Sequence, residues 1–207
     1  MTAGLGNVFI VAAPSGGGKT SLIKNLLNIL DCIEVSISHT TRVPRPGEVD
    51  GVDYFFVNQA TFIEMIAQNA FIEHAQVFDY YYGTSVAQIH RRLQDGIDVI
   101  LDIDWQGARQ IKKIFPEAKG IFILPPSMQT LKDRLSSRGQ DDNETIEYRM
   151  QGAQAEITHY NEFDYLIINE HFESAVNDLR SIVVADRLSI GRQKNKMKKI
   201  ISSFVHF

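Results

Sequence analysis

An α/β fold is predicted, in which a parallel sheet forms the core and helices cover both faces. The first observation is a set of short apolar runs, typical of strands buried on both sides of a parallel sheet; they span 8–12, 99–104, 120–124 and 165–168. The second is that helical patterns separate the later runs, because alternating strands and helices favour a parallel sheet. The third is a glycine-rich turn that joins the first run to a helical pattern.

Composition limits the possible classes of protein. The chain has 207 residues, 44% hydrophobic and 22% charged, as expected for a single globular domain. Its net charge of −4 argues against a dedicated nucleic-acid binder. A single cysteine excludes an internal disulfide framework, and no apolar run approaches the roughly 20 residues that span a bilayer. No basic residue precedes Lys19, as a secretory signal would require. We therefore expect a cytoplasmic protein that binds neither nucleic acid nor membrane, of unspecified oligomeric state.

The turn after the first strand fits the phosphate-binding P-loop pattern, with alanine in place of its first glycine. Glycines let consecutive backbone N–H groups curl around phosphate oxygens, and the following helix directs its positive end at them. The lysine can reach the β- and γ-phosphates, and the threonine hydroxyl can ligate Mg²⁺. The alternative, a structural glycine turn, does not account for the flanking strand and helix. The predicted ATP-binding residues are Ala13, Pro14, Ser15, Gly16, Gly17, Gly18, Lys19 and Thr20.

The segment from about residue 36 to 84 interrupts the alternation and predicts an inserted mixed α/β subdomain. Apolar and polar residues alternate over 33–37, which favours a half-exposed strand. Further short strands are expected at 54–57 and 71–75, with a short helix between them after Asn58 as N-cap. The loop 40–47 carries two arginines among prolines, and guanidinium forks match phosphate oxygens.

Two carboxylates follow the next apolar run. Asp102 and Asp104 are predicted at i and i+2 on the strand end, both pointing to one side. Ligands of open α/β sheets bind beside the carboxyl ends of strands, so a carboxylate there can hold Mg²⁺ directly or through water. The alternative is that these residues cap the helix that follows.

The rest of the chain predicts helices, a lid and a tail. Helical patterns cover 107–115, 127–137 and 172–188, and the polar piece 136–143 resembles a mobile lid. The basic segment 192–199 favours a solvated helix end or a frayed tail.

Several motifs together resemble the guanylate kinase family, over roughly residues 8–187. In chain order they are SHTTRVPRPGE from Ser38, GVDYFF from Gly51, FIEHA from Phe71, YYGT from Tyr81, LDIDWQG from Leu101, FILPPS from Phe122, and Arg134 with Arg138-Gly139. The resemblance implies one domain over 1–207. Its core would comprise 1–35, 85–133 and 156–207, its GMP-binding subdomain 36–84 and its lid 134–155.

The resemblance also implies roles for individual residues. The GMP phosphate would be held by Arg42, Arg45, Tyr54 and Tyr82, and guanine would be read by Glu73, Ser38 and Thr84, with Asp104 beside them. One carboxylate accepts from both N1 and N2 of guanine, whereas adenine offers no such pair of donors. The catalytic cations would be Lys19, Arg42, Arg134, Arg138 and Arg149, and the Mg²⁺ ligands Thr20 and Asp102.

The expected activity is Mg²⁺-dependent phosphorylation of GMP, and of dGMP, by ATP in purine nucleotide metabolism. Two alternatives remain. One is a kinase for another nucleotide or a sugar phosphate, which would not share this acceptor set. The other is a catalytically inactive, guanylate-kinase-like module that binds proteins, in which the P-loop or acceptor site is usually degraded. His39 and His74 have no metal-ligand spacing with each other or with Cys32, so no zinc is expected.

Overall fold

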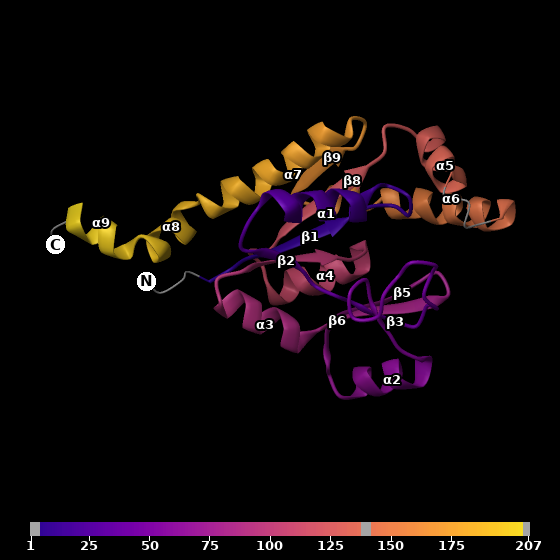
Figure 1. The fold of residues 1–207 in the computed structure, drawn as a ribbon, viewed down its shortest axis with the longest axis horizontal. Coiled ribbons are helices and arrows are strands. Elements are labelled where there is room, and N and C mark those ends of the chain that lie inside the picture. The colour runs from indigo at the N-terminus through magenta and orange to yellow at the C-terminus, as the bar shows by residue number, and fades with distance from the viewer. Residues whose placement is uncertain (1–4, 138–141, 205–207) are drawn as a thin grey trace.

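The protein is described by a computed structural model, which covers residues 5–137 and 142–204. Two sheets and the helices around them make up the molecule (Figure 1). The larger sheet has five strands and the smaller has four. The α/β fold class predicted from the sequence is therefore confirmed.

The five-stranded sheet is entirely parallel and has the order β2-β7-β1-β8-β9. The central strand β1 is buried along its whole length, as its continuous apolar sequence predicts. Its side chains alternate between the faces, so Phe9 and Val11 join one core and Val8 and Ile10 the other. The strands are β1 Val8–Ala12, β2 Ile33–Val35, β7 Asp98–Asp102, β8 Lys119–Leu124 and β9 Tyr165–Ile168.

Helices cover both faces of this sheet (Figure 1). The helices α1 (Lys19–Ile29) and α7 (Phe172–Arg187) pack on one face, where Leu22 and Leu179 are fully buried. On the opposite face lie α3 (Val86–Gln94) and α4 (Trp105–Ile114). The helix after β1 and the helix after β7 thus leave neighbouring strands on opposite faces. A ligand crevice is expected between two such strands.

The four-stranded sheet lies on one side of the core with α2 (Figure 1). Its order is β4-β3-β6-β5, with β3 antiparallel to β6 and parallel to β4. Asn58 caps α2 by accepting a hydrogen bond from the Thr61 N–H, as predicted. The strands are β3 His39–Thr40, β4 Phe55–Phe56, β5 Phe71–Val77 and β6 Tyr80–Ser85, and α2 spans Gln59–Ala67. The subdomain limits 36–84 stay a prediction.

Two further helices, α5 (Met128–Ser137) and α6 (Asn143–Ile157), lie at the end of the molecule opposite the C-terminus (Figure 1). A 3₁₀ turn at Tyr160–Glu162 follows α6. The predicted lid, 134–155, includes these helices and stays a prediction. Within the described part of the chain, no helix is both long enough and apolar enough to cross a bilayer.

Two sequence expectations about strand ends are wrong. The strand expected over 33–37 ends at Val35 and belongs to the five-stranded core sheet as β2, where its three residues pair with Asp98, Val99 and Ile100 of β7. The strand β7 ends at Asp102, so Asp104 is not on it. Asp104 is instead the N-cap of α4 and accepts from the Gly107 N–H at 2.9 Å. The helix-capping alternative therefore holds for this residue.

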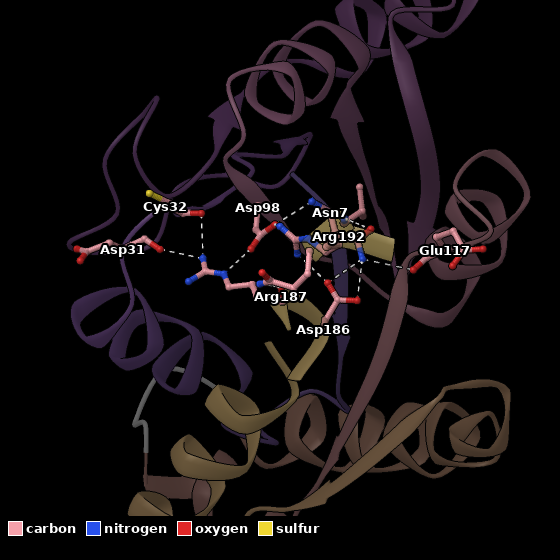
Figure 2. Close-up of polar contacts among 10 residues, drawn as sticks. Asn7, Asp31, Cys32, Asp98, Glu117, Asp186, Arg187 and Arg192 are labelled. Atoms are coloured by element: carbon pink, nitrogen blue, oxygen red, sulfur yellow. Dashed lines mark hydrogen bonds and ion pairs between the residues drawn. The ribbon is translucent and has the colours of Figure 1, made fainter. Parts of the chain in front are cut away.

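The basic C-terminal segment is not simply a solvated tail, as Figure 2 shows. Arg187 and Arg192 each form an ion pair with the buried Asp98, at 2.8 and 2.7 Å. Arg192 also pairs with Asp186, which accepts from Asn7. This cluster ties α7 and α8 (Ile190–Lys196) to the start of β7, away from the crevice. Beyond it, α9 (Lys198–Phe204) extends from the body (Figure 1).

Candidate functional site

The glycine-rich turn curls at the carboxyl end of β1. Gly16 and Gly18 have φ of +90° and +92°, a left-handed conformation that residues with side chains rarely adopt. A Cβ at Gly18 would lie 2.4 Å from the Asn169 side-chain nitrogen, so the loop also requires glycine for space. Gly18 precedes the first turn of α1, whose unpaired N–H groups and positive end favour an anion there. The loop can therefore receive phosphate oxygens.

The side chain of Lys19 extends from the first turn of α1 to the carboxyl end of β7. Its Nζ is 2.7 Å from Asp102 and donates to the Ile103 carbonyl at 3.2 Å. Burial alone would lower the pKa of Lys19, but Asp102, with Glu156 and Asp104, raises it above the ordinary value. The lysine is therefore cationic at neutral pH and is held at the strand ends that flank the loop.

A cavity of about 160 Å³ lies between the start of α1 and the inserted segment that follows β2. Thr20 and Lys24 line it from α1, and Asp102 lines it from β7. Ser38, Arg45 and Tyr54 of the inserted region line its other side. Residues from both predicted substrate sites thus share one cavity.

Arg42 is the central cation on the inserted side. It is only 7% exposed, and its guanidinium forms a bidentate pair with Glu48 at 2.9 and 2.7 Å. Its Cζ lies 5.4 Å from the ring centroid of Tyr54, whose ring is 6.0 Å from that of Tyr82. Burial would lower the pKa of Arg42, but the hydrogen bonds and charge of Glu48, together with Tyr82, raise it. Three of the four residues expected around the GMP phosphate therefore lie together.

The predicted guanine-reading residues also meet. Thr84 on β6 donates to the Glu73 carboxylate on β5 at 2.5 Å, and the Ser38 hydroxyl lies 3.4 Å from that of Thr84. Burial raises the pKa of Glu73 to about 7, although the Thr84 hydrogen bond opposes the rise. Glu73 is 3% exposed, so an unpaired charge on it is costly. A ligand that donates two hydrogen bonds would meet this need.

Gly107, in the first turn of α4, makes room for the Glu73 carboxylate. A Cβ at this position would lie 2.5 Å from Glu73 Oε2, which is closer than atoms can approach. We expect Gly107→Ala to displace Glu73 and to raise KM for the nucleotide that Glu73 reads about tenfold, leaving KM for ATP nearly unchanged. Steady-state kinetics with each substrate varied measures this. Gly191→Ala is the matched control, because nothing lies within 4 Å of its added Cβ; an equal change in both KM values of Gly107→Ala would contradict the assignment.

Of the three arginines expected in the lid, Arg134 has a side chain that faces the glycine loop. Its Nη2 donates to the Asn169 carbonyl at 2.9 Å, while its buried Nη1 lacks a hydrogen-bond partner among the described residues. That nitrogen lies 3.9 Å from the Cβ position of Gly18, so it faces the glycine loop. A buried N–H without a partner is costly, and an anion in the loop would satisfy it. Arg149 lies on α6, half-buried, and Arg138 falls outside the described residues.

Three residues that touch the site were not assigned a role from the sequence. Asn169, just after β9, donates to the Gly17 carbonyl at 3.0 Å. Its position after a parallel strand was an available signal. Glu156, on α6, accepts from the Ser15 N–H at 3.2 Å, and burial raises its pKa to about 7 against the effect of Lys19. No local pattern distinguishes it from other helix carboxylates. Glu48 lies in the loop that carries Arg42 and Arg45, and no role was assigned to it.

Known proteins resemble this chain over nearly its whole length. A sequence model of the family described as guanylate kinase matches residues 6–186. The chain is 60% identical to a guanylate kinase of Legionella pneumophila (strain Paris) over 197 residues, 95% of this chain and 94% of that protein. It is 54% identical to a guanylate kinase of Escherichia coli (strain K12) over 202 residues, 97% and 98% of the two chains.

The fold gives the same result. The crystal structure of guanylate kinase from Anaplasma phagocytophilum superposes with a TM-score of 0.81 at 31% identity, over 98% of this chain and 97% of that one. The family model covers most of the chain, and the relatives match it nearly from end to end. The chain therefore belongs to the guanylate kinase family.

Proposed function

We propose that the guanylate kinase reaction, transfer of the γ-phosphoryl of ATP to the phosphate of GMP, takes place in the cavity between the start of α1 and the inserted segment. The observation that carries this proposal is the shared cavity: Thr20 and Asp102 line one side of it, and Arg45 and Tyr54 line the other. An anion held by each side would meet the other there. The inactive, protein-binding alternative gains no support, because Lys19 and both acceptor arginines are present.

On the acceptor side, Arg42, Arg45, Tyr54 and Tyr82 would hold the GMP phosphate. A guanidinium and phenol hydroxyls donate to phosphate oxygens, and Arg42 is already charged and nearly buried. Glu73, with Ser38 and Thr84 beside it, would accept from N1 and N2 of guanine. Asp104 would contribute indirectly, because its carboxylate already caps α4 and accepts from Gln106.

On the donor side, the glycine loop and Lys19 would hold the β- and γ-phosphates of ATP. Arg134 would add a donor at the orphaned Nη1, and Arg138 and Arg149 are proposed to complete this set. Thr20 and Asp102 offer hard oxygen donors in the same cavity, which suits Mg²⁺. Bound there with ATP, Mg²⁺ would neutralise charge on the phosphates.

The attacking group would be an oxygen of the GMP phosphate, ionised near neutral pH, so no general base is needed. What the chain supplies is alignment and cationic charge around two anions that repel each other. Water competes as acceptor, so the subdomain and lid are expected to close over both nucleotides. We also propose that dGMP is accepted, since no assigned residue is required to read the ribose 2′-hydroxyl. The proposed compartment of the enzyme is the cytoplasm.

The proposal is tested by measuring ADP release from MgATP with GMP, AMP, CMP and UMP side by side. Activity at least a hundredfold greater with GMP is expected, because only guanine pairs two donors with one carboxylate. ADP release that is equal for all four nucleotides, or independent of them, would contradict it.

The raised pKa of Glu73 predicts a pH dependence of GMP binding. Below pH 7 the carboxyl group holds a proton and presents a donor to the donors of guanine, whereas above pH 7 it is an acceptor. KM for GMP should therefore fall by about tenfold between pH 6 and pH 8, following the ionised fraction. The GMP phosphate itself titrates near pH 6. In Glu73→Gln only the titration of the GMP phosphate remains. An identical pH profile of KM for GMP in wild type and variant would therefore exclude Glu73 from guanine recognition.

A further inference from the structure

The loop that carries the two acceptor arginines is organised around Glu48. Its carboxylate accepts from Nη1 and Nη2 of Arg42 and, at 2.7 Å, from the backbone N–H of Arg45. The Glu48 N–H in turn donates to the Arg45 carbonyl at 3.0 Å, across a turn in which Gly47 has φ of +87°. One side chain thus fixes the guanidinium of Arg42 and the backbone of Arg45.

The contacts of Arg42 leave one edge of its fork for a ligand. The bonds to Glu48 and to the Val43 carbonyl use both N–H groups of Nη1 and one of Nη2. The remaining two, on Nε and Nη2, form the side edge of the guanidinium, which matches two phosphate oxygens. The Tyr82 hydroxyl raises the pKa of the same guanidinium. The centroid of the Tyr54 ring lies 5.4 Å from its Cζ. The guanidinium therefore lies beside both tyrosines of the predicted phosphate site.

Burial makes this arrangement costly without Glu48. Arg42 is 7% exposed, and a buried guanidinium with no counter-charge is strongly unfavourable. Glu48 provides that counter-charge in the absence of a ligand, and its own side chain is only 19% exposed. The arginine is therefore held in one orientation before a nucleotide arrives, which reduces the cost of ordering it on binding.

We propose that Glu48 is the positioning residue of the acceptor-phosphate site: it holds the Nη edge of Arg42 and the turn at Arg45, so that the Nε edge is presented to the phosphate. This inference rests on the proposed function, because it takes the ligand of that edge to be the phosphate of GMP. A carboxylate beside a phosphate could instead compete for the arginines. The two roles predict opposite effects of removing its charge.

Binding of GMP and of guanosine to Glu48→Gln, measured by calorimetry, separates the roles. Guanosine lacks the phosphate, so the ratio of the two dissociation constants isolates the phosphate contribution. Positioning predicts that GMP binds about ten- to hundredfold more weakly while guanosine binding is unchanged, which also shows that the variant is folded. Unchanged or tighter GMP binding would overturn the proposal. Glu34→Gln is the matched control, since it breaks an exposed ion pair with Arg92.

A second comparison tests whether Glu48 affects GMP binding through Arg42. In an Arg42→Ala background, Glu48→Gln should cost clearly less GMP affinity than in the wild type, because only the turn at Arg45 remains to be held. An equal loss in both backgrounds would contradict action through Arg42. If wild type itself binds guanosine as tightly as GMP, then the proposed acceptor site fails. If wild type prefers GMP and Glu48→Gln does not change that preference, then only the role of Glu48 fails.

Discussion

Lys19→Ala is expected to lower kcat about a hundred- to thousandfold, the usual effect of removing one preorganised electrostatic donor from a reacting group. The Nζ of Lys19 is fixed by Asp102 at 2.7 Å and by the Ile103 carbonyl, at the base of the glycine loop. Lys24, which lies further along α1, pairs with Asp53 and has 66% of its side chain exposed, so it is not placed to replace Lys19. Single-turnover kinetics with saturating MgATP and GMP measures the loss directly.

The fold should survive this substitution, because both partners of the ion pair are partly exposed, at 20% and 21%. A thermal unfolding curve close to that of wild type checks this. Lys113→Ala, at an exposed position of α4, is the matched control and should retain full activity. Full activity in Lys19→Ala would remove the glycine loop from the mechanism.

Glu73→Gln is expected to reduce the preference for GMP over AMP, measured as the ratio of kcat/KM values, by about 30- to 1000-fold, or about 2–4 kcal/mol. The amide presents one acceptor and one donor where guanine needs two acceptors. AMP should lose less, because its N1 accepts the hydrogen bond that the amide can donate.

Glu64→Gln serves as the control for Glu73→Gln, since it changes an exposed carboxylate of the same region whose contact is Gln68. It should leave the preference unchanged. A selectivity ratio in Glu73→Gln equal to that of wild type would assign guanine recognition to other residues.

The sequence predicted the parts of the fold that local pattern determines. The apolar run 8–12 is β1, and Asn58 caps α2 as expected. The strand β3 has only His39 and Thr40 and exists because both pair with β4 and β6, so no local signal marks it. Asp104 was placed on a strand because the apolar run continues to Ile103, whereas the start of α4 required a cap.

For the candidate site, too, local pattern predicts some features and tertiary packing determines the others. Lys19 in a glycine turn and Arg42 in a proline-stiffened loop were identifiable from their own chemistry. The roles of Glu73, Ser38 and Thr84 came from the family resemblance. The partners of these residues come from tertiary packing. Arg192 was interpreted as part of a solvated tail, because the buried Asp98 that it pairs with lies 94 positions away. Glu156 reaches Ser15 across 141 positions for the same reason.

Two anion sites of one chain are proposed to face each other, so that a phosphoryl group passes directly between their ligands. Transfer of radiolabel from [γ-³²P]ATP, with products separated after a single turnover, measures this passage. Nearly all label is expected in GDP, and little is expected as inorganic phosphate while GMP is present. Label released mainly as inorganic phosphate, at a rate that GMP does not change, would contradict it.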